Sequence, residues 1–170
     1  MTAFKYCMLR GDMNSDKKLA TLAKIARRMN AAGLTWAVGA SLMLFLRGRV
    51  GDFHDIDIMV AEEQVAQAKD ILKGLGVNKG GRPNPKYLTR HFNEFNVNGV
   101  EVDLLAGYVI VCNGIPYECP LRPEDIDTTA LVLGEAIPLH ALAEWRRYYL
   151  LMGRPEKAKL CQNLADENIK

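Results

Sequence analysis

The chain has 170 residues, of which 49% are hydrophobic and 25% charged, so it fits one soluble domain with a substantial core. Its formal net charge of +2 does not favour nucleic-acid binding, and its four cysteines, without any CxxC spacing, argue against a thiolate metal site or a disulfide framework. Residues 1–15 lack the apolar segment of a secretory signal, and no apolar run reaches the roughly 18 residues of a membrane span. We therefore expect a cytoplasmic protein that does not act at a membrane.

The N-terminal half predicts helices alternating with short strands. Residues 1–14 show little pattern, and we expect them to be a loosely ordered segment ahead of a single domain over 15–170. Ser15 and Asp16 are good caps for a helix that ends before Gly33. The elements predicted next are a buried strand over 35–38, a short helix over 41–46, a strand over 55–60 and an amphipathic helix over 62–75.

The C-terminal half predicts hairpins followed by helices. Asn-Gly pairs at 98–99 and 113–114 are strong hairpin turns; they join strands over 88–97 and 100–105, and over 108–112 and 115–118. The basic segment 79–86, rich in Gly and Pro, is predicted to be a loop. The remaining predictions are a short strand over 130–133, C-terminal helices from about 138 with one over 139–152, and a last helix opening at Pro155. Together these predict an α+β fold, with a mixed β-sheet flanked by helices and helices at the C-terminus.

Two aspartates alternate with isoleucines in the predicted strand over 55–60. Residues two apart on a strand point to the same face, so Asp55 and Asp57 lie side by side, roughly 7 Å apart, while the isoleucines enter a core. Two like charges placed in this way repel one another unless water, a base or a cation lies between them. A third carboxylate, Asp103, follows the first Asn-Gly turn. If its strand neighbours the first, the three carboxylates can bind one or two Mg²⁺ ions, which prefer oxygen ligands.

A turn of small residues, Gly39-Ala40-Ser41, lies between a predicted strand and a predicted helix. Its backbone N–H groups and hydroxyl can face a phosphate, and its small side chains allow a triphosphate to approach closely. Arg47 and Arg49 lie between this turn and the carboxylates, where they could contact the triphosphate. Solvation at the end of the short helix is an equally good interpretation of both arginines.

The loop charges allow two interpretations. Arg82, Lys86 and Tyr87 are candidates for binding an acceptor substrate, with the two cations suited to acidic groups. Charge clusters in loops are, however, more often simply solvated. Trp145 and Tyr149 fall at core-like spacing on a predicted helix, which favours packing over function.

In their order and spacing, these elements resemble the nucleotidyltransferase superfamily of the polymerase-beta type. Its members share a Gly-Gly/Ser turn, a strand with two aspartates between apolar residues, and a third Asp on a neighbouring strand. The likeness is closest to small bacterial antibiotic-type nucleotidyltransferases and their uncharacterised relatives, and it covers roughly 19–164. The segment 153–157, GRPEK, is similar to their Gly-Arg-Pro-Lys-Asp-like segment but lacks the Asp. Ala40 stands at the second glycine of the usual turn, and the connection from Gly39 to Asp55 is longer than in many members.

The resemblance implies roles for these residues. Asp55 and Asp57 would bind Mg²⁺, Asp103 would activate the acceptor as a ligand or base, and the turn at 39–41 would hold the β- and γ-phosphates. The implied reaction is transfer of a nucleoside monophosphate from an NTP, with ATP expected, to a hydroxyl acceptor with release of pyrophosphate. A large RNA acceptor is not favoured, and a homodimer is compatible with the resemblance. The alternatives are a non-catalytic nucleotide-binding or antitoxin-like module that acts through a protein partner, and a phosphohydrolase.

Overall fold

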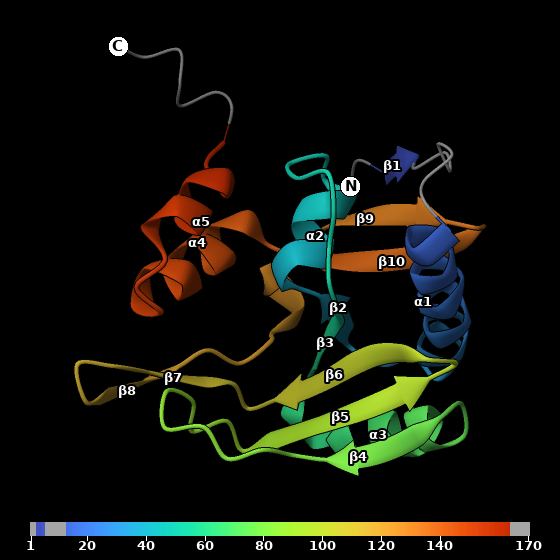
Figure 1. The fold of residues 1–170 in the computed structure, drawn as a ribbon, viewed down its shortest axis with the longest axis horizontal. Helices are drawn as coiled ribbons and strands as arrows, with labels where there is room; N and C mark the ends of the chain where they lie inside the picture. Colours follow the sequence, from blue (N-terminus) through green and yellow to red (C-terminus); the bar gives the residue numbers. More distant parts are fainter. Residues whose placement is uncertain (1–2, 6–12, 164–170) are drawn as a thin grey trace.

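In the computed structural model, which describes residues 3–5 and 13–163, the fold is built on a mixed eight-stranded sheet (Figure 1). The strand order is β1-β9-β10-β2-β3-β6-β5-β4. β3 runs parallel to β6, β10 parallel to β2, and β1 parallel to β9, while the other pairs are antiparallel. The strands are β1 (Ala3–Lys5), β2 (Trp36–Val38), β3 (Ile56–Val60), β4 (Val77–Gly80), β5 (His91–Val97), β6 (Val100–Ala106), β9 (Ile126–Val132) and β10 (Glu135–His140).

The helices fall into two groups. α1 (Met13–Ala31) and α3 (Val65–Lys73) contact one another and the sheet, and the short α2 (Ala40–Leu46) contacts β3. α4 (Leu142–Leu151) and α5 (Pro155–Leu160) pack together to one side of the sheet (Figure 1). The predicted α+β class, with a mixed sheet and C-terminal helices, is confirmed. In the described part of the chain no helix is long and apolar enough to cross a membrane.

Alternation along the central strands separates the core from the polar face. On β6, Val102 and Leu104 are fully buried, whereas Asp103 between them is only partly buried. On β3, Ile56 and Ile58 are buried on either side of Asp57. The buried apolar residues of both strands belong to one hydrophobic cluster with residues of α1 and α3. The aspartates between them therefore lie on the opposite face of the sheet.

Several predicted boundaries differ from the structure. Residues 138–140, predicted as the start of the C-terminal helices, are the end of the strand β10, and α4 begins only at Leu142. The cause is tertiary: Leu133 and Gly134 form a tight turn with positive φ, and β10 then pairs with both β9 and β2. The predicted strand over 130–133 is the end of the longer β9. In the same way, the predicted loop over 79–86 begins inside β4, and the strand predicted from 88 begins at His91.

The N-terminal helix begins slightly earlier than predicted, and the segment before it is only partly described. α1 starts at Met13, two residues before the predicted start at Ser15. Within 1–14, the strand β1 pairs with β9, and residues 1–2 and 6–12 lie outside the described residues. The predicted helix over 62–75 is a short 3-10 turn over 62–64 followed by α3. Both Asn-Gly hairpins are confirmed.

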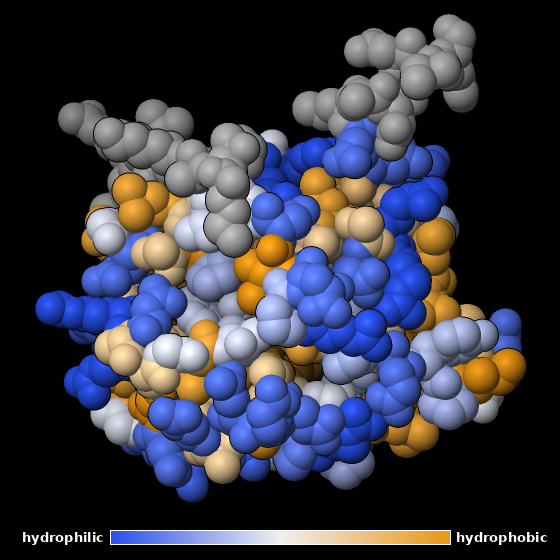
Figure 2. Space-filling model, turned by 180° about the vertical axis from the view of Figure 1, so that it is seen from behind, coloured by the Kyte–Doolittle hydropathy of each residue, from blue (hydrophilic) through white to orange (hydrophobic). Residues whose placement is uncertain are grey.

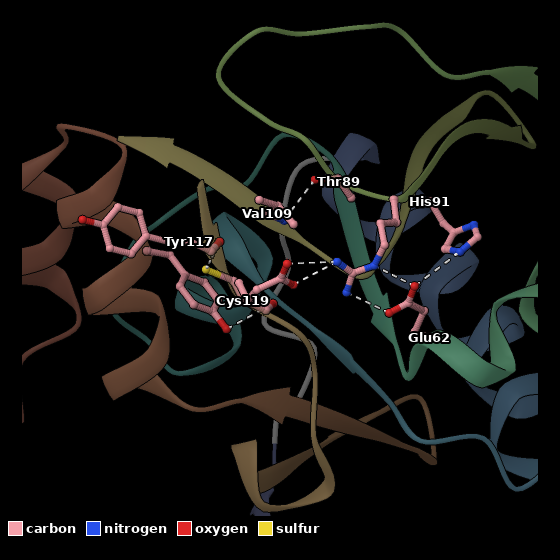
Figure 3. Close-up of polar contacts among 9 residues, drawn as sticks. Glu62, Thr89, His91, Val109, Tyr117 and Cys119 are labelled. Atoms are coloured by element: carbon pink, nitrogen blue, oxygen red, sulfur yellow. Dashed lines mark hydrogen bonds and ion pairs between the residues drawn. The ribbon is translucent and has the colours of Figure 1, made fainter. Parts of the chain in front are cut away.

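Arg90 links a separate hairpin of β7 (Val109–Cys112) and β8 (Ile115–Glu118) to Glu62 in the 3-10 turn at 62–64. Figure 3 shows Glu62 in this network, with His91 beside it. The Arg90 guanidinium donates to Glu62 through Nε at 2.7 Å and to Glu118 through a second nitrogen at 2.9 Å. Gly107 leaves the space for this group: its φ is +59°, and a Cβ there would lie 2.7 Å from Arg90 Nε. The network fixes the segment ahead of β5, in which Thr89 lines a cavity over the polar face of the sheet.

Candidate active site

A cavity of about 630 Å³ lies between the polar face of the sheet and the C-terminal helices. The residues that line it come from the turn at 39–41, from the strands β3 and β6, from the loop before β5, and from α4 and α5. Seen from behind, the molecule is mainly hydrophilic, with apolar residues in small separate groups (Figure 2). The polar and charged residues that line the cavity are Ser41, His54, Asp55, Asp57, Arg82, Asn84, Tyr87, Thr89, Glu94, Asp103, Tyr108, Trp145, Tyr149, Arg154 and Lys157.

The parallel pairing of β3 and β6 sets Asp57 directly opposite Asp103. Asp55 lies just before β3 rather than within it, and it lines the same cavity. All three predicted carboxylates are therefore brought to one site. Burial, together with the charges of Asp103 and Asp55, raises the pKa of Asp57 to about 8. Burial and the neighbouring carboxylates raise the pKa of Asp103 to about 6. Burial and the neighbouring carboxylates thus both disfavour the ionised forms of Asp57 and Asp103 when no cation is bound.

A fourth carboxylate, Glu94 on β5, extends this row. It pairs in register with Asp103, so Asp57, Asp103 and Glu94 stand side by side across three adjacent strands. Glu94 belongs to none of the motifs that predicted the other three carboxylates. Its signal was present in the sequence, because counting back from the two-residue turn at 98–99 places residue 94 opposite residue 103. Arg82 lies beside it, with Nε 3.4 Å from the Glu94 carboxylate.

The carboxylate oxygens of the cavity are suitable ligands for a Mg²⁺ ion that is bound jointly with a substrate. Among the described residues, no three His, Cys, Asp or Glu side chains are arranged to hold a metal ion by themselves. Mg²⁺ is, however, commonly bound through one or two carboxylates together with waters and substrate phosphates. Asp57 and Asp103, both partly buried and paired on neighbouring strands, offer such oxygen ligands. The residues present therefore fit an ion that arrives with a phosphate.

The turn at 39–41 is hydrogen-bonded to β3 and packs against α4. The Gly39 amide donates to the Asp57 carbonyl at 3.1 Å, so this amide is already used. A Cβ on Gly39 would overlap the indole of Trp145, 2.7 Å from Cε2. Glycine is therefore required here for close packing, whatever else the turn binds. Ala40 and Ser41 follow and line the cavity.

Ala40 occupies the left-handed region, with φ of +50°. This conformation costs an L-residue other than glycine about 1–2 kcal/mol. We expect Ala40→Gly to raise the free energy of unfolding by about 0.5–1 kcal/mol, since relief of strain exceeds the added entropy of the unfolded chain. Urea denaturation monitored by circular dichroism measures this change. An Ala40→Gly protein less stable than wild type would contradict the assignment of strain.

The other predicted binding residues divide between the cavity and the rest of the surface. Arg82 and Tyr87 line the cavity, and Tyr87 stacks on Tyr108 with ring centroids 5.8 Å apart. Lys86 is exposed and does not line it.

Arg47 and Arg49 also lie outside the cavity lining. Arg47 bonds to Asp127 and to the His140 carbonyl, while Arg49 bonds to the carbonyls of Leu160 and Gln162. Both guanidinium groups therefore hold the C-terminal part of the chain in place, and the structure does not bring them together with the carboxylates.

Sequence comparison identifies the family to which the chain belongs. The family model of the aminoglycoside-2''-adenylyltransferases matches residues 21–164. The chain belongs to this family. Membership indicates nucleotidyltransferase activity and confirms the superfamily predicted from the motifs. No protein of curated function matches the chain.

Solved structures agree with the family assignment. A proposed nucleotidyltransferase of Thermotoga maritima is 26% identical, with a TM-score of 0.69, over 96% of this chain and 98% of that one. The aminoglycoside enzyme ANT(2'')-Ia, solved in complex with adenylyl-2''-tobramycin, is 14% identical with a TM-score of 0.57, over 85% and 87% of the two chains. The lincosamide antibiotic adenylyltransferase LnuA, solved with lincomycin, is 11% identical with a TM-score of 0.55, over 84% and 97%. The last two share the fold.

In this member of the aminoglycoside-2''-adenylyltransferase family, α4 contributes both to the core and to the lining of the cavity. Trp145 and Tyr149 are buried, as predicted, at 5% and 2% exposed, yet both line the cavity. Trp145 also touches the turn at Gly39. Helical spacing alone identifies such residues as core and cannot distinguish a core position from a position at the cavity wall.

Proposed function

We propose that the protein is a Mg²⁺-dependent enzyme that transfers a nucleoside monophosphate from an NTP, with ATP the expected donor, to a hydroxyl acceptor. The observation that carries this proposal is the register of β3 and β6, which sets Asp57 opposite Asp103 in a cavity also lined by Asp55 and the turn at 39–41. The proposed place of action is the cytoplasm, where NTP and Mg²⁺ are available.

The carboxylates have distinct tasks in this proposal. Asp55, Asp57 and Asp103 would hold Mg²⁺, which supplies positive charge against the triphosphate. The acceptor oxygen attacks the α-phosphorus and forms a new P–O bond. The bond from the α-phosphorus to the bridging oxygen breaks, and pyrophosphate leaves with the electron pair. Asp103, as a metal ligand or as a base, activates the acceptor hydroxyl, and the proton of that hydroxyl leaves as the new P–O bond forms.

The remaining cavity residues divide into donor and acceptor groups. The Gly39 amide already donates to the Asp57 carbonyl and is not free for a ligand. In this proposal the phosphate oxygens therefore bind to the other donors of the turn, which are the amides of Ala40 and Ser41 and the Ser41 hydroxyl. Arg82, Tyr87 and Glu94, which also line the cavity, would bind the acceptor. The ligands of the two antibiotic-modifying structural neighbours support a small hydroxyl-bearing acceptor.

A transfer assay tests the function. The protein is incubated with ATP labelled at the α-phosphate, Mg²⁺ and a panel of aminoglycosides and lincosamides, and both labelled product and pyrophosphate are quantified. We expect equal amounts of adenylylated acceptor and pyrophosphate, and loss of both when EDTA removes the metal. Release of inorganic phosphate in place of pyrophosphate would contradict the proposal.

A further inference from the structure

Glu94 is the one carboxylate of the row across β3, β6 and β5 that the proposed metal site does not use. It stands beside Asp103, lines the cavity, and has a side chain that is only 23% exposed. A carboxylate in an acidic cavity attracts a cation, because a nearby positive charge stabilises the ionised form. Glu94 is therefore a binding position for a positively charged group.

The chain itself supplies a cation at this position. Arg82 lines the cavity, and its Nε lies 3.4 Å from the Glu94 carboxylate. Among the described residues, no other ion pair involves Glu94. The Arg82 side chain is 78% exposed, so a ligand that enters the cavity can meet it. A ligand cation that approaches Glu94 therefore has to compete with a guanidinium that is already there.

The backbone of the loop after β4 sets the position of Arg82. The Gly80 amide donates to the Asn78 side chain at 2.8 Å, which fixes the start of the loop. A Cβ on Gly81 would lie 2.5 Å from the Phe92 carbonyl oxygen, so the loop approaches β5 more closely than any other residue type would allow. Arg82 is the next residue along the chain. Its place beside β5 therefore follows from the backbone and does not depend on the ion pair alone.

The surface next to this ion pair is apolar. Phe92 on β5 is paired with Leu105 on β6, two residues along from the pair of Glu94 and Asp103. Residues two apart on a strand share a face, and Phe92 and Leu105 both line the cavity. A ligand beyond Asp103 therefore meets two apolar side chains and a carboxylate whose charge is already paired.

We propose that Arg82 determines acceptor specificity: it occupies the cation position at Glu94, so that the enzyme selects neutral hydroxyl compounds with an apolar face over acceptors with several amino groups. This inference rests on the proposed function and names its acceptor class. A polycationic acceptor has to displace Arg82, whereas a neutral acceptor packs on Phe92 and Leu105 and leaves the ion pair intact. Because the ion pair is exposed on one side, the selection is severalfold and not absolute.

Calorimetric titration of spermine, a linear polyamine, with Mg²⁺ in excess measures this selection without requiring transfer. We expect Arg82→Gln to bind spermine about fivefold more tightly than wild type. In a Glu94→Gln background the same substitution should change the affinity by less than about twofold, because the cation position is gone. Lys86→Gln is the matched control: it removes the same charge from an exposed position on the same loop, outside the cavity lining, and should have an effect of less than about twofold.

The outcomes separate this inference from the proposed function. Spermine affinity that rises no more in Arg82→Gln than in Lys86→Gln would overturn the inference, even if the wild type transfers a nucleotide. A rise that requires Glu94, in a protein that transfers nothing from any NTP, would support the exclusion of cations by Arg82 and overturn the function. Arg82→Gln changes an exposed side chain, so the fold is not at risk in the deciding variant.

Discussion

Replacing Asp57 with Asn is expected to reduce nucleotidyl transfer by on the order of a thousandfold and, at the same time, to stabilise the metal-free protein at pH 8. The loss of activity follows from removal of a carboxylate opposite Asp103. The gain in stability follows because the ionised form of Asp57 is disfavoured by partial burial and by the two neighbouring carboxylates. We expect about 1–2 kcal/mol, or roughly 3–6 °C in Tm for a chain of this size.

The same variant has a defined pH signature. The pKa of Asp57 rises from 3.8 in the unfolded chain to about 8 in the folded one, so between these values the folded state binds more protons. Stability from this group is therefore lost as pH rises from about 4 to about 8, and Asp103 adds a similar loss up to about 6. Thermal unfolding of wild type should show this fall, and Asp57→Asn should show a smaller one.

The structure offers a control variant for this pH dependence and defines the result that would contradict it. Asp70→Asn, at an exposed position on α3, removes the same charge without touching the cavity and should leave the pH profile unchanged. Mg²⁺ at pH 8 should raise the Tm of wild type more than that of Asp57→Asn. Identical pH profiles for wild type and Asp57→Asn would contradict the raised pKa of Asp57.

Gly39→Ala is expected to destabilise the protein by about 2 kcal/mol, because the added methyl group overlaps the Trp145 indole. The backbone itself is not the cause, since Gly39 has φ of −124°, which any residue can adopt. Gly51→Ala is the matched control: it adds the same methyl group to a glycine with nothing within 4 Å. Chemical denaturation of both variants gives the comparison.

A double-mutant cycle sharpens this test. Trp145→Phe removes the atoms that the new methyl group would meet, so Gly39→Ala should cost much less in the Trp145→Phe background than in wild type. The coupling would show that α4 packs directly on the turn at 39–41. Equal costs of Gly39→Ala in both backgrounds would contradict this contact.

Local patterns in the sequence were sufficient to predict that Asp55, Asp57 and Asp103 lie together in one site. The alternation around Asp57 and the Asn98-Gly99 turn ahead of Asp103 each specify a strand and a face, and pairing of the two strands then brings the residues together. The small-residue turn was likewise predicted between strand and helix, because Gly39 and Ser41 carry a local signal.

The remainder of the site depends on tertiary packing that no local pattern contains. Trp145 and Tyr149 occupy core-like helical positions, and only the seating of α4 against Gly39 makes them part of the cavity wall. Arg47 and Arg49 are near the turn in sequence but bond to β9, β10 and the end of α5 instead. The strand β10 was missed because pairing with two neighbours outweighed a local pattern that favoured a helix.

The most direct test of a nucleotide site built on these aspartates is calorimetric titration of ATP and the other NTPs into wild type and into Asp55→Asn/Asp57→Asn, with and without Mg²⁺. We predict that wild type binds at least one NTP with micromolar to sub-millimolar affinity only when Mg²⁺ is present, and that the double variant does not bind it. Absence of Mg²⁺-dependent binding of any NTP by the wild-type protein would contradict this account.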